Sequence, residues 1–281
     1  MKKHQSIDMK ITYYLLVVCL LFSLVSCSTV LTNAPFPTDE KIRNHFSKLS
    51  NYANDTFVYA LMSSNAYNDS TQFIIPNWKR VQRLESLLGL EADVYEYQKE
   101  GKLERIVIAF RGTEASWSDW VYGNLNWCFY GHLQGQYGDA EDVYLKVSNI
   151  PKYNKIPIAV TGHSLGGGLA IHLSLLKDID AYVFNPSPRI CVNGDKLDKQ
   201  NNNKRVVISE TGEILHGISN YSFNFQELST DRGNIDLLEG GSVKEHNMYD
   251  LARALTKLAT IYDNIEAHKV MEINRVAFNF H

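Results

Sequence analysis

One serine in the sequence has neighbours that suit it to act as a nucleophile. Ser164 is the centre of Gly162-His163-Ser164-Leu165-Gly166, which follows the apolar run 156–160 and precedes a stretch rich in Gly, Ala and Leu, 165–176. A strand, a tight turn and a helix in this order form a nucleophile elbow, which exposes the serine hydroxyl and strains its backbone. Because the first N–H groups of the helix face a developing oxyanion, the pattern predicts acyl transfer at Ser164.

A serine hydroxyl becomes a good nucleophile only when a neighbouring base takes its proton. In elbow-containing enzymes the chain order is serine, acid, histidine, so the base is expected well after Ser164. His246 follows the Gly240-Gly241 turn and directly precedes a predicted helix, 247–259. We therefore expect His246 to be the general base, with His216 as the next candidate.

The acid that orients the histidine is expected in the turn after a predicted buried strand, 205–208. Two carboxylates lie there, Glu210 and Glu213. Glu210 is closer to the strand end, and Glu213 lies deeper in the turn. The residues alone leave both open.

The rest of the chain predicts the elements that must position these side chains. Helices are expected at 45–61, 137–150, 165–176 and 247–259, and a short amphipathic stretch is expected to end at 88–89. Strands are expected at 92–97, 103–110, 156–160, 180–184 and 205–208, with a turn at 99–102. This alternation predicts an α/β domain at 45–281, with a mostly parallel central sheet and helices on both faces.

Two motifs resemble the class 3 (fungal-type) lipases. The stretch from Val160 to Gly167 is similar to the elbow of that family, and Ile108-Ala109-Phe110-Arg111-Gly112-Thr113 is similar to its oxyanion strand end. The resemblance implies an α/β-hydrolase fold and a serine carboxylic-ester hydrolase acting on lipids, either acylglycerols or phospholipids. It also implies that the N–H groups of Thr113 and Leu165 hold the oxyanion.

The same resemblance bears on the base and the acid. The loop around His246 resembles the family's final histidine loop. The family usually has an Asp followed by two apolar residues, and Glu213-Ile214-Leu215 has this form with Glu in place of Asp. Glu213 is therefore the preferred acid, and Glu210 is the alternative.

The first 26 residues predict export. Lys2, Lys3 and Lys10 precede an apolar run of 15 residues, 11–25, whereas a spanning helix needs about 20. This indicates a signal peptide rather than a retained anchor, which is the alternative. Leu24-Val25-Ser26-Cys27 resembles the lipobox of bacterial lipoproteins. It implies lipidation of Cys27 and a membrane-anchored protein, in the outer membrane if the cell is Gram-negative. The Ser, Thr, Asn and Pro of residues 28–44 predict a tether, so that 27–44 comprises the lipidated Cys and the tether.

Charge and composition limit the classes of partner and cofactor that are expected. The net charge is −3 and Lys and Arg are not clustered, so nucleic acid is not an expected partner. No His, Cys and Asp spacing is typical of a metal site, so neither a metal nor another cofactor is expected. The expected partners are a lipid or other ester substrate and the membrane that holds the lipid anchor.

Several alternatives stay open at this level. The aromatic-rich segment 116–130 could form an acyl-chain pocket or lid, or ordinary core, and Cys128 and Cys191 could be bridged or free. The same site could serve a non-lipolytic esterase or an acyltransferase. A catalytically inactive surface lipoprotein with a binding role is the remaining alternative, because a fold alone does not fix a function.

Overall fold

The computed structural model describes residues 39–67, 73–112, 131–187, 203–211, 231–237 and 246–278. The chain divides into two compact units, Met1–Ser47 and Lys48–His281, and the fold below is that of the second. The predicted signal peptide and Cys27 lie outside the described residues, as do Cys128, Cys191 and the segment 116–130. None of the described helices is long and apolar enough to cross a membrane.

A seven-stranded sheet with its strands in sequence order is the centre of the described fold. The strands are β1 (Trp78–Glu85), β2 (Glu91–Lys99), β3 (Lys102–Phe110), β4 (Ile158–His163), β5 (Asp180–Phe184), β6 (Arg205–Glu210) and β7 (Asp231–Ile235). β1, β2 and β3 pair antiparallel, and β3 to β7 pair parallel. The predicted mostly parallel sheet is confirmed.

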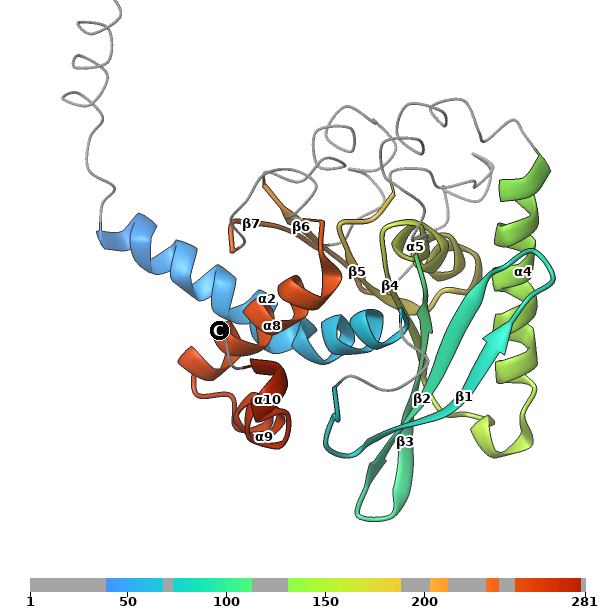
Figure 1. The fold of residues 1–281 in the computed structure, drawn as a ribbon, viewed down its shortest axis with the longest axis horizontal. Helices are drawn as coiled ribbons and strands as arrows, with labels where there is room; N and C mark the ends of the chain where they lie inside the picture. The colour runs from blue at the N-terminus through green and yellow to red at the C-terminus, as the bar shows by residue number, and fades with distance from the viewer. Residues whose placement is uncertain are drawn as a thin grey trace, which may run out of the picture. The chain divides into compact units, whose positions relative to one another are not determined.

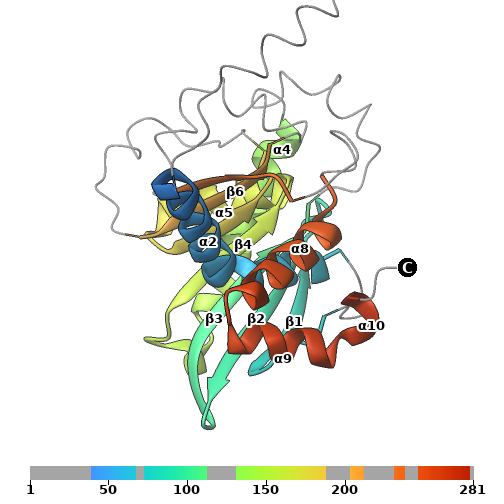
Figure 2. The ribbon, with the colours of Figure 1, turned by 90° about the vertical axis from the view of Figure 1, so that its left-hand side faces the viewer.

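Helices cover both faces of this sheet, as predicted (Figures 1 and 2). On one face lie α8 (Met248–Ile261), α9 (Ile265–Ile273), α10 (Arg275–Phe278) and the part of α2 (Asp39–Asn65) from Leu49 onward. α4 (Gly131–Ser148), the 3₁₀ turn η2 (Pro151–Tyr153) and α5 (Leu165–Lys177) pack on the other.

The side chains of β3 show why that strand is apolar throughout. Val107 and Ala109 join the core under α2 and α8, whereas Ile106, Ile108 and Phe110 join the core under α4 and α5. Successive side chains of a strand point to opposite faces, so a strand covered on both sides has no polar alternation. The continuous apolar run predicted this correctly.

The amphipathic stretch expected before residue 89 is the strand β1, and its spacing has a physical explanation. A β-bulge lies between Arg80 and Gln82, so Val81 is an extra residue relative to β2. Val81 and Leu84 consequently pack into the same core although they are three residues apart. A bulge therefore gave a strand the spacing of a helix. The short strand β7 and the helices α9 and α10 were not predicted, and α2 begins at Asp39 rather than at residue 45.

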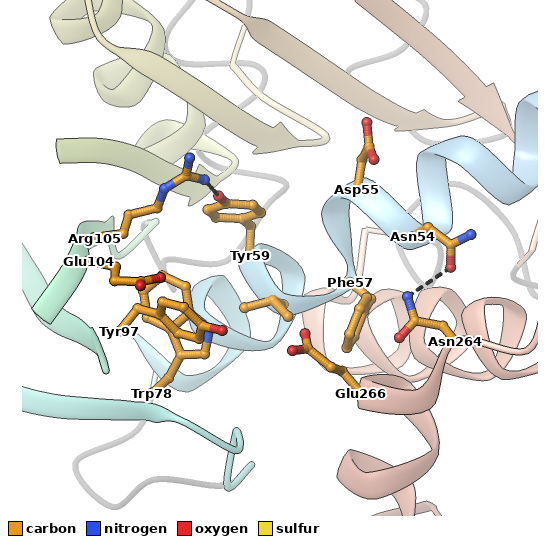
Figure 3. A pocket seen from close by; sticks show the side chains of 11 residues that line it. Asn54, Asp55, Phe57, Tyr59, Trp78, Tyr97, Glu104, Arg105, Asn264 and Glu266 are labelled. Atoms are coloured by element: carbon orange, nitrogen blue, oxygen red, sulfur yellow. Dashed lines mark hydrogen bonds between the residues drawn. The ribbon is translucent and has the colours of Figure 1, made fainter. Parts of the chain in front are cut away.

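A cavity of about 360 Å³ lies beside the amino-terminal part of β3, between α2, β1 and the start of α9 (Figure 3). The Arg105 guanidinium donates a hydrogen bond of 2.8 Å to the Tyr59 hydroxyl there, and the Tyr59 ring stacks on Tyr182 at 3.8 Å. On the opposite wall Asn264 donates a bond of 3.0 Å to Asn54. Arg105 precedes the carboxyl end of β3 by five residues, roughly 17 Å along the strand. This cavity is therefore remote from the site at the strand ends.

Candidate active site

The parallel strands end in register, and this brings the predicted site residues to one edge of the sheet. Phe110 of β3 lies opposite Gly162 of β4, and Phe184 of β5 lies opposite both His163 and Ile208. Residues that follow these strands are therefore neighbours in space although far apart in sequence. In open α/β sheets this carboxyl edge is where ligands bind.

Ser164 lies on the turn between β4 and α5 and has the strained backbone expected of a nucleophile elbow. Its φ is 57° and its ψ is −125°, a conformation that costs on the order of 1–3 kcal/mol in a non-glycine residue. The Ser164 N–H donates to the Phe184 carbonyl at 3.1 Å, and the Ser164 carbonyl accepts from Ser187 at 2.8 Å and from Gly168 at 3.2 Å. These bonds to the next strand end and to the helix hold the turn in place.

Two glycines let the end of β3 and the residues that follow it approach this turn. A Cβ on Gly166 would lie 2.3 Å from the Phe110 carbonyl oxygen, so the first turn of α5 packs directly against the end of β3. A Cβ on Gly112 would lie 3.2 Å from the Ser164 Cβ and 2.2 Å from the Tyr67 hydroxyl. Neither position has room for a side chain. The segment that ends at Gly112 consequently lies beside the nucleophile.

The two predicted oxyanion donors differ in what the structure describes. Leu165 is the first residue of α5, where backbone N–H groups have no acceptor within the helix. With Gly112 and Arg111 it lines a cavity of about 220 Å³ next to the elbow. Thr113 follows Gly112 directly and lies outside the described residues.

His246 is buried and lies beside the elbow. The next residue, Asn247, caps α8 by accepting hydrogen bonds from the N–H groups of Tyr249 at 2.9 Å and Asp250 at 3.2 Å. This cap fixes the chain just after His246. The His246 ring lies 4.3 Å from the His163 ring between centroids, with an interplanar angle of 44°. Since His163 directly precedes Ser164, the predicted base packs against the elbow residue that adjoins the predicted nucleophile. His216 lies outside the described residues.

Both histidines are neutral at ordinary pH because they are buried. Burial lowers the pKa of His246 from 6.5 to about 3. Burial also lowers the pKa of His163 well below 6.5, and the neighbouring His246 lowers it further, while the His246 backbone acts in the opposite direction. A neutral imidazole can accept the proton of an attacking hydroxyl, so His246 is in the form that a general base needs.

Of the two candidate acids, the structure describes only Glu210. It is completely buried at the end of β6, and its carboxylate accepts a hydrogen bond of 3.1 Å from the Leu237 N–H. Its own N–H donates to the Asn185 side chain at 2.8 Å. Glu210 thus ties β6 to the segment that follows β7. Glu213 lies outside the described residues.

Tyr67 belongs to the site and was not found from the sequence. It follows the carboxyl end of α2, and its hydroxyl lies 2.7 Å from Nδ1 of His163. The Arg111 guanidinium lies 6.0 Å from the Tyr67 ring centroid and forms an ion pair of 2.6 Å with Glu91. Tyr67 and His163 are 96 residues apart, and no local pattern links them. Only the approach of α2 to the elbow brings them together.

The comparison with protein families agrees with this geometry. Residues 58–272 match the Tle-like phospholipase domain, which is described as phospholipase-like. The enzyme is an ester hydrolase with the α/β-hydrolase fold, as predicted. The chain belongs to the Tle-like phospholipase domain family. A comparison with curated protein sequences finds no match.

Solved lipase structures are also similar to this chain. A lipase from Rhizopus microsporus var. chinensis is 17% identical with a TM-score of 0.46, over 61% of this chain and 69% of the other. Lipase II from Rhizopus niveus is 16% identical with a TM-score of 0.47, over 63% and 77%. A triacylglycerol lipase from Penicillium expansum is 16% identical with a TM-score of 0.47, over 70% and 82%.

Proposed function

We propose that this protein is a serine phospholipase or acylglycerol lipase that cleaves carboxylic esters of lipids. The observation that carries the proposal is the strained Ser164 at the amino end of α5, with the neutral His246 packed on the adjoining His163 and with Gly112 close to the Ser164 Cβ. Membership of the Tle-like phospholipase domain family supports a lipid substrate and favours a phospholipid.

The proposed chemistry follows from the positions of these groups. The Ser164 hydroxyl attacks the ester carbonyl while His246 takes its proton, and the N–H groups of Leu165 and Thr113 hold the oxyanion. His246 then gives the proton to the departing alcohol, which leaves an acyl-enzyme. Water, activated by His246, releases the fatty acid and restores the serine.

We propose Glu213 as the carboxylate that orients His246. Glu213 is followed by two apolar residues, as is the acid in the lipases that the sequence resembles. The Glu210 carboxylate accepts a hydrogen bond from the Leu237 N–H, which gives it a structural role at the end of β6. This observation favours Glu213 over Glu210.

The test is hydrolysis of phospholipid vesicles and of p-nitrophenyl esters with short to long acyl chains by the full chain in detergent. We expect release of fatty acid, a preference for long chains, and loss of turnover in Ser164→Ala and His246→Ala. Ser148→Ala on α4 and His268→Ala on α9 are matched controls that should keep wild-type rates. Turnover of short esters alone would instead indicate a non-lipolytic esterase, and ester transfer to an added alcohol would indicate an acyltransferase.

We also propose that Cys27 is lipidated and anchors the enzyme to a membrane. The basic start, the short apolar run and the lipobox-like residues 24–27 support this proposal. A Cys27→Ser variant should lose incorporation of labelled fatty acid and move from the membrane fraction to the soluble fraction, while a Cys191→Ser variant should not. Membrane attachment that is unchanged in Cys27→Ser would contradict the proposal and favour a retained apolar anchor.

A further inference from the structure

We propose that Tyr67 and His163 are positioning residues that hold the general base His246 in line with Ser164. The proposal rests on the function proposed above. It assigns a role to the residue between the first glycine and the serine of the elbow motif, and to a tyrosine from the end of α2. The three side chains form a continuous array, with a contact of 2.7 Å from Tyr67 to His163 and ring centroids 4.3 Å apart from His163 to His246.

The hydrogen bonding of His163 determines which of its nitrogens carries the proton. A neutral imidazole has one donor and one acceptor, and a phenol hydroxyl can donate to the acceptor. At Nε2 no hydrogen-bond partner of normal geometry lies within the described residues, and the His246 backbone raises the pKa of His163. A backbone carbonyl facing an N–H has this effect. The contact at Nδ1 therefore points to a Tyr67 hydroxyl that donates to it, which leaves the proton of the neutral His163 ring on Nε2.

The surroundings of Tyr67 leave the array little freedom to move. A Cβ on Gly112 would lie 2.2 Å from the Tyr67 hydroxyl, so the oxyanion strand end packs directly on that oxygen. Arg111, paired with Glu91, lies over the face of the Tyr67 ring. The oxyanion side of the site is thereby connected to the base side through one tyrosine.

This arrangement has a clear catalytic consequence. His246 becomes positively charged when Ser164 attacks, and a charged neighbour would oppose that change. The buried, neutral His163 supplies a rigid ring without such a charge. Loss of its hydrogen bonds should let His246 move, and a displacement of about 1 Å can lower the rate about a hundredfold.

Two substitutions at His163 separate positioning from simple packing. In His163→Gln the side-chain amide N–H can take the place of Nε2–H, which keeps the contact towards His246. In His163→Asn the shorter side chain can accept from Tyr67 at the Nδ1 position but cannot reach the His246 backbone. Tyr67→Phe removes the hydroxyl donor and keeps the ring.

The experiment measures kcat, KM, their pH dependence and the rate of labelling by a fluorophosphonate, together with the melting temperature, for the full chain and these variants. We expect Tyr67→Phe and His163→Asn to lower kcat and the labelling rate at least about tenfold with little change in KM. His163→Gln should lose less activity than His163→Asn, because its amide N–H can donate towards His246 without a hydrogen bond from Tyr67. A shift of the acidic limb of the pH profile in the impaired variants would further support a role exerted through His246.

Two results would overturn the proposal, and both can be distinguished from a failure of the proposed hydrolase function. Wild-type kcat and labelling in Tyr67→Phe and His163→Asn would leave the hydrolase intact and remove the positioning role. If kcat and the labelling rate fall equally in all three variants, and only as far as the fraction of folded protein falls, the two residues have a packing role only. If the wild type itself reacts with neither the fluorophosphonate nor any ester, the proposed function fails and the positioning role fails with it.

Discussion

The carboxyl edge of the parallel strands and the β1–β2 hairpin both bury polar groups, but they treat them differently. In the hairpin the fully buried Asp93 carboxylate accepts bonds from Arg83 at 2.8 and 3.0 Å and from Arg80 at 3.2 Å. At the strand edge Ser164 has a positive φ, and the buried His163 and His246 are neutral. The hairpin pairs its buried carboxylate with two arginines, whereas the strand edge contains a serine with a strained backbone and two uncharged histidines.

This difference indicates which region serves stability and which serves chemistry. A buried carboxylate with several donors fixes local structure, and removal of one partner leaves an uncompensated charge. A strained serine backbone does not stabilise the fold, and such strain concentrates at functional sites. Substitutions in the two regions should therefore separate activity from stability.

The largest effect is expected at Ser164. Ser164→Ala should lower kcat by at least about 10⁴-fold, because the covalent step has no other nucleophile. Ser164→Gly should be equally inactive. Glycine in place of alanine usually lowers the free energy of unfolding by up to about 1 kcal/mol. At position 164 the positive φ strains alanine but not glycine, so Ser164→Gly should be at least as stable as Ser164→Ala. Denaturant unfolding measures this, and a clear loss in Ser164→Gly would argue against backbone strain at the elbow.

The next effect separates the two candidate acids. Glu213→Gln should lower kcat by on the order of 10³- to 10⁴-fold, since the imidazole would lose its orienting carboxylate. Glu210→Gln should keep kcat within a few-fold, because its amide oxygen can still accept from Leu237. Steady-state kinetics on one ester gives both values. The reverse pattern would assign the acid to Glu210.

In the hairpin the expected effect is on stability alone. Asp93→Ala should destabilise the fold by about 3 kcal/mol, because Arg80 and Arg83 would be left partly buried without their carboxylate. The activity of the folded fraction should not change. Asp142→Ala on the exposed face of α4 is the matched control. A loss of kcat/KM in folded Asp93→Ala would contradict the separation of the two regions.

The smallest effect is the partial loss, in a single-histidine variant, of a pH dependence of stability that originates at the strand edge. The pKa of His246 is lowered to about 3 from 6.5, and that of His163 is also lowered, so below pH 6.5 the unfolded chain binds protons that the folded chain does not. The stabilisation is complete above pH 6.5 and falls as the pH is lowered towards 3. The slope should be about 1.4 kcal/mol per pH unit for each histidine. His163→Gln should reduce the slope, as measured by urea unfolding from pH 7 to pH 5, whereas His268→Gln should not.

The sequence predicted the parts of this fold that depend on local patterns. The apolar run of β3 indicated a strand covered on both faces, and the glycines around Ser164 indicated the elbow. Asn247 indicated the start of a helix just after His246. Each of these rests on residues within one element, where side-chain type and backbone conformation are directly coupled.

The remainder depends on contacts between distant segments. The bulge at Val81 gave β1 the spacing of a helix, and β7 is a short strand that contains Gly233 and Asn234. Tyr67 reaches the site only because α2 ends beside the elbow. The choice between Glu210 and Glu213 depends on how the chain turns after β6, which spacing does not determine.

The central claim is that Ser164 is the nucleophile, and covalent trapping tests it most directly. The full chain would be incubated with a fluorophosphonate, digested and mapped by mass spectrometry, with Ser164→Ala and Ser148→Ala treated in parallel. The account predicts a single adduct on the peptide that contains Ser164, which is absent in Ser164→Ala, unchanged in Ser148→Ala and formed in step with the loss of esterase activity. An adduct on another residue, or ester turnover that persists in Ser164→Ala, would contradict it.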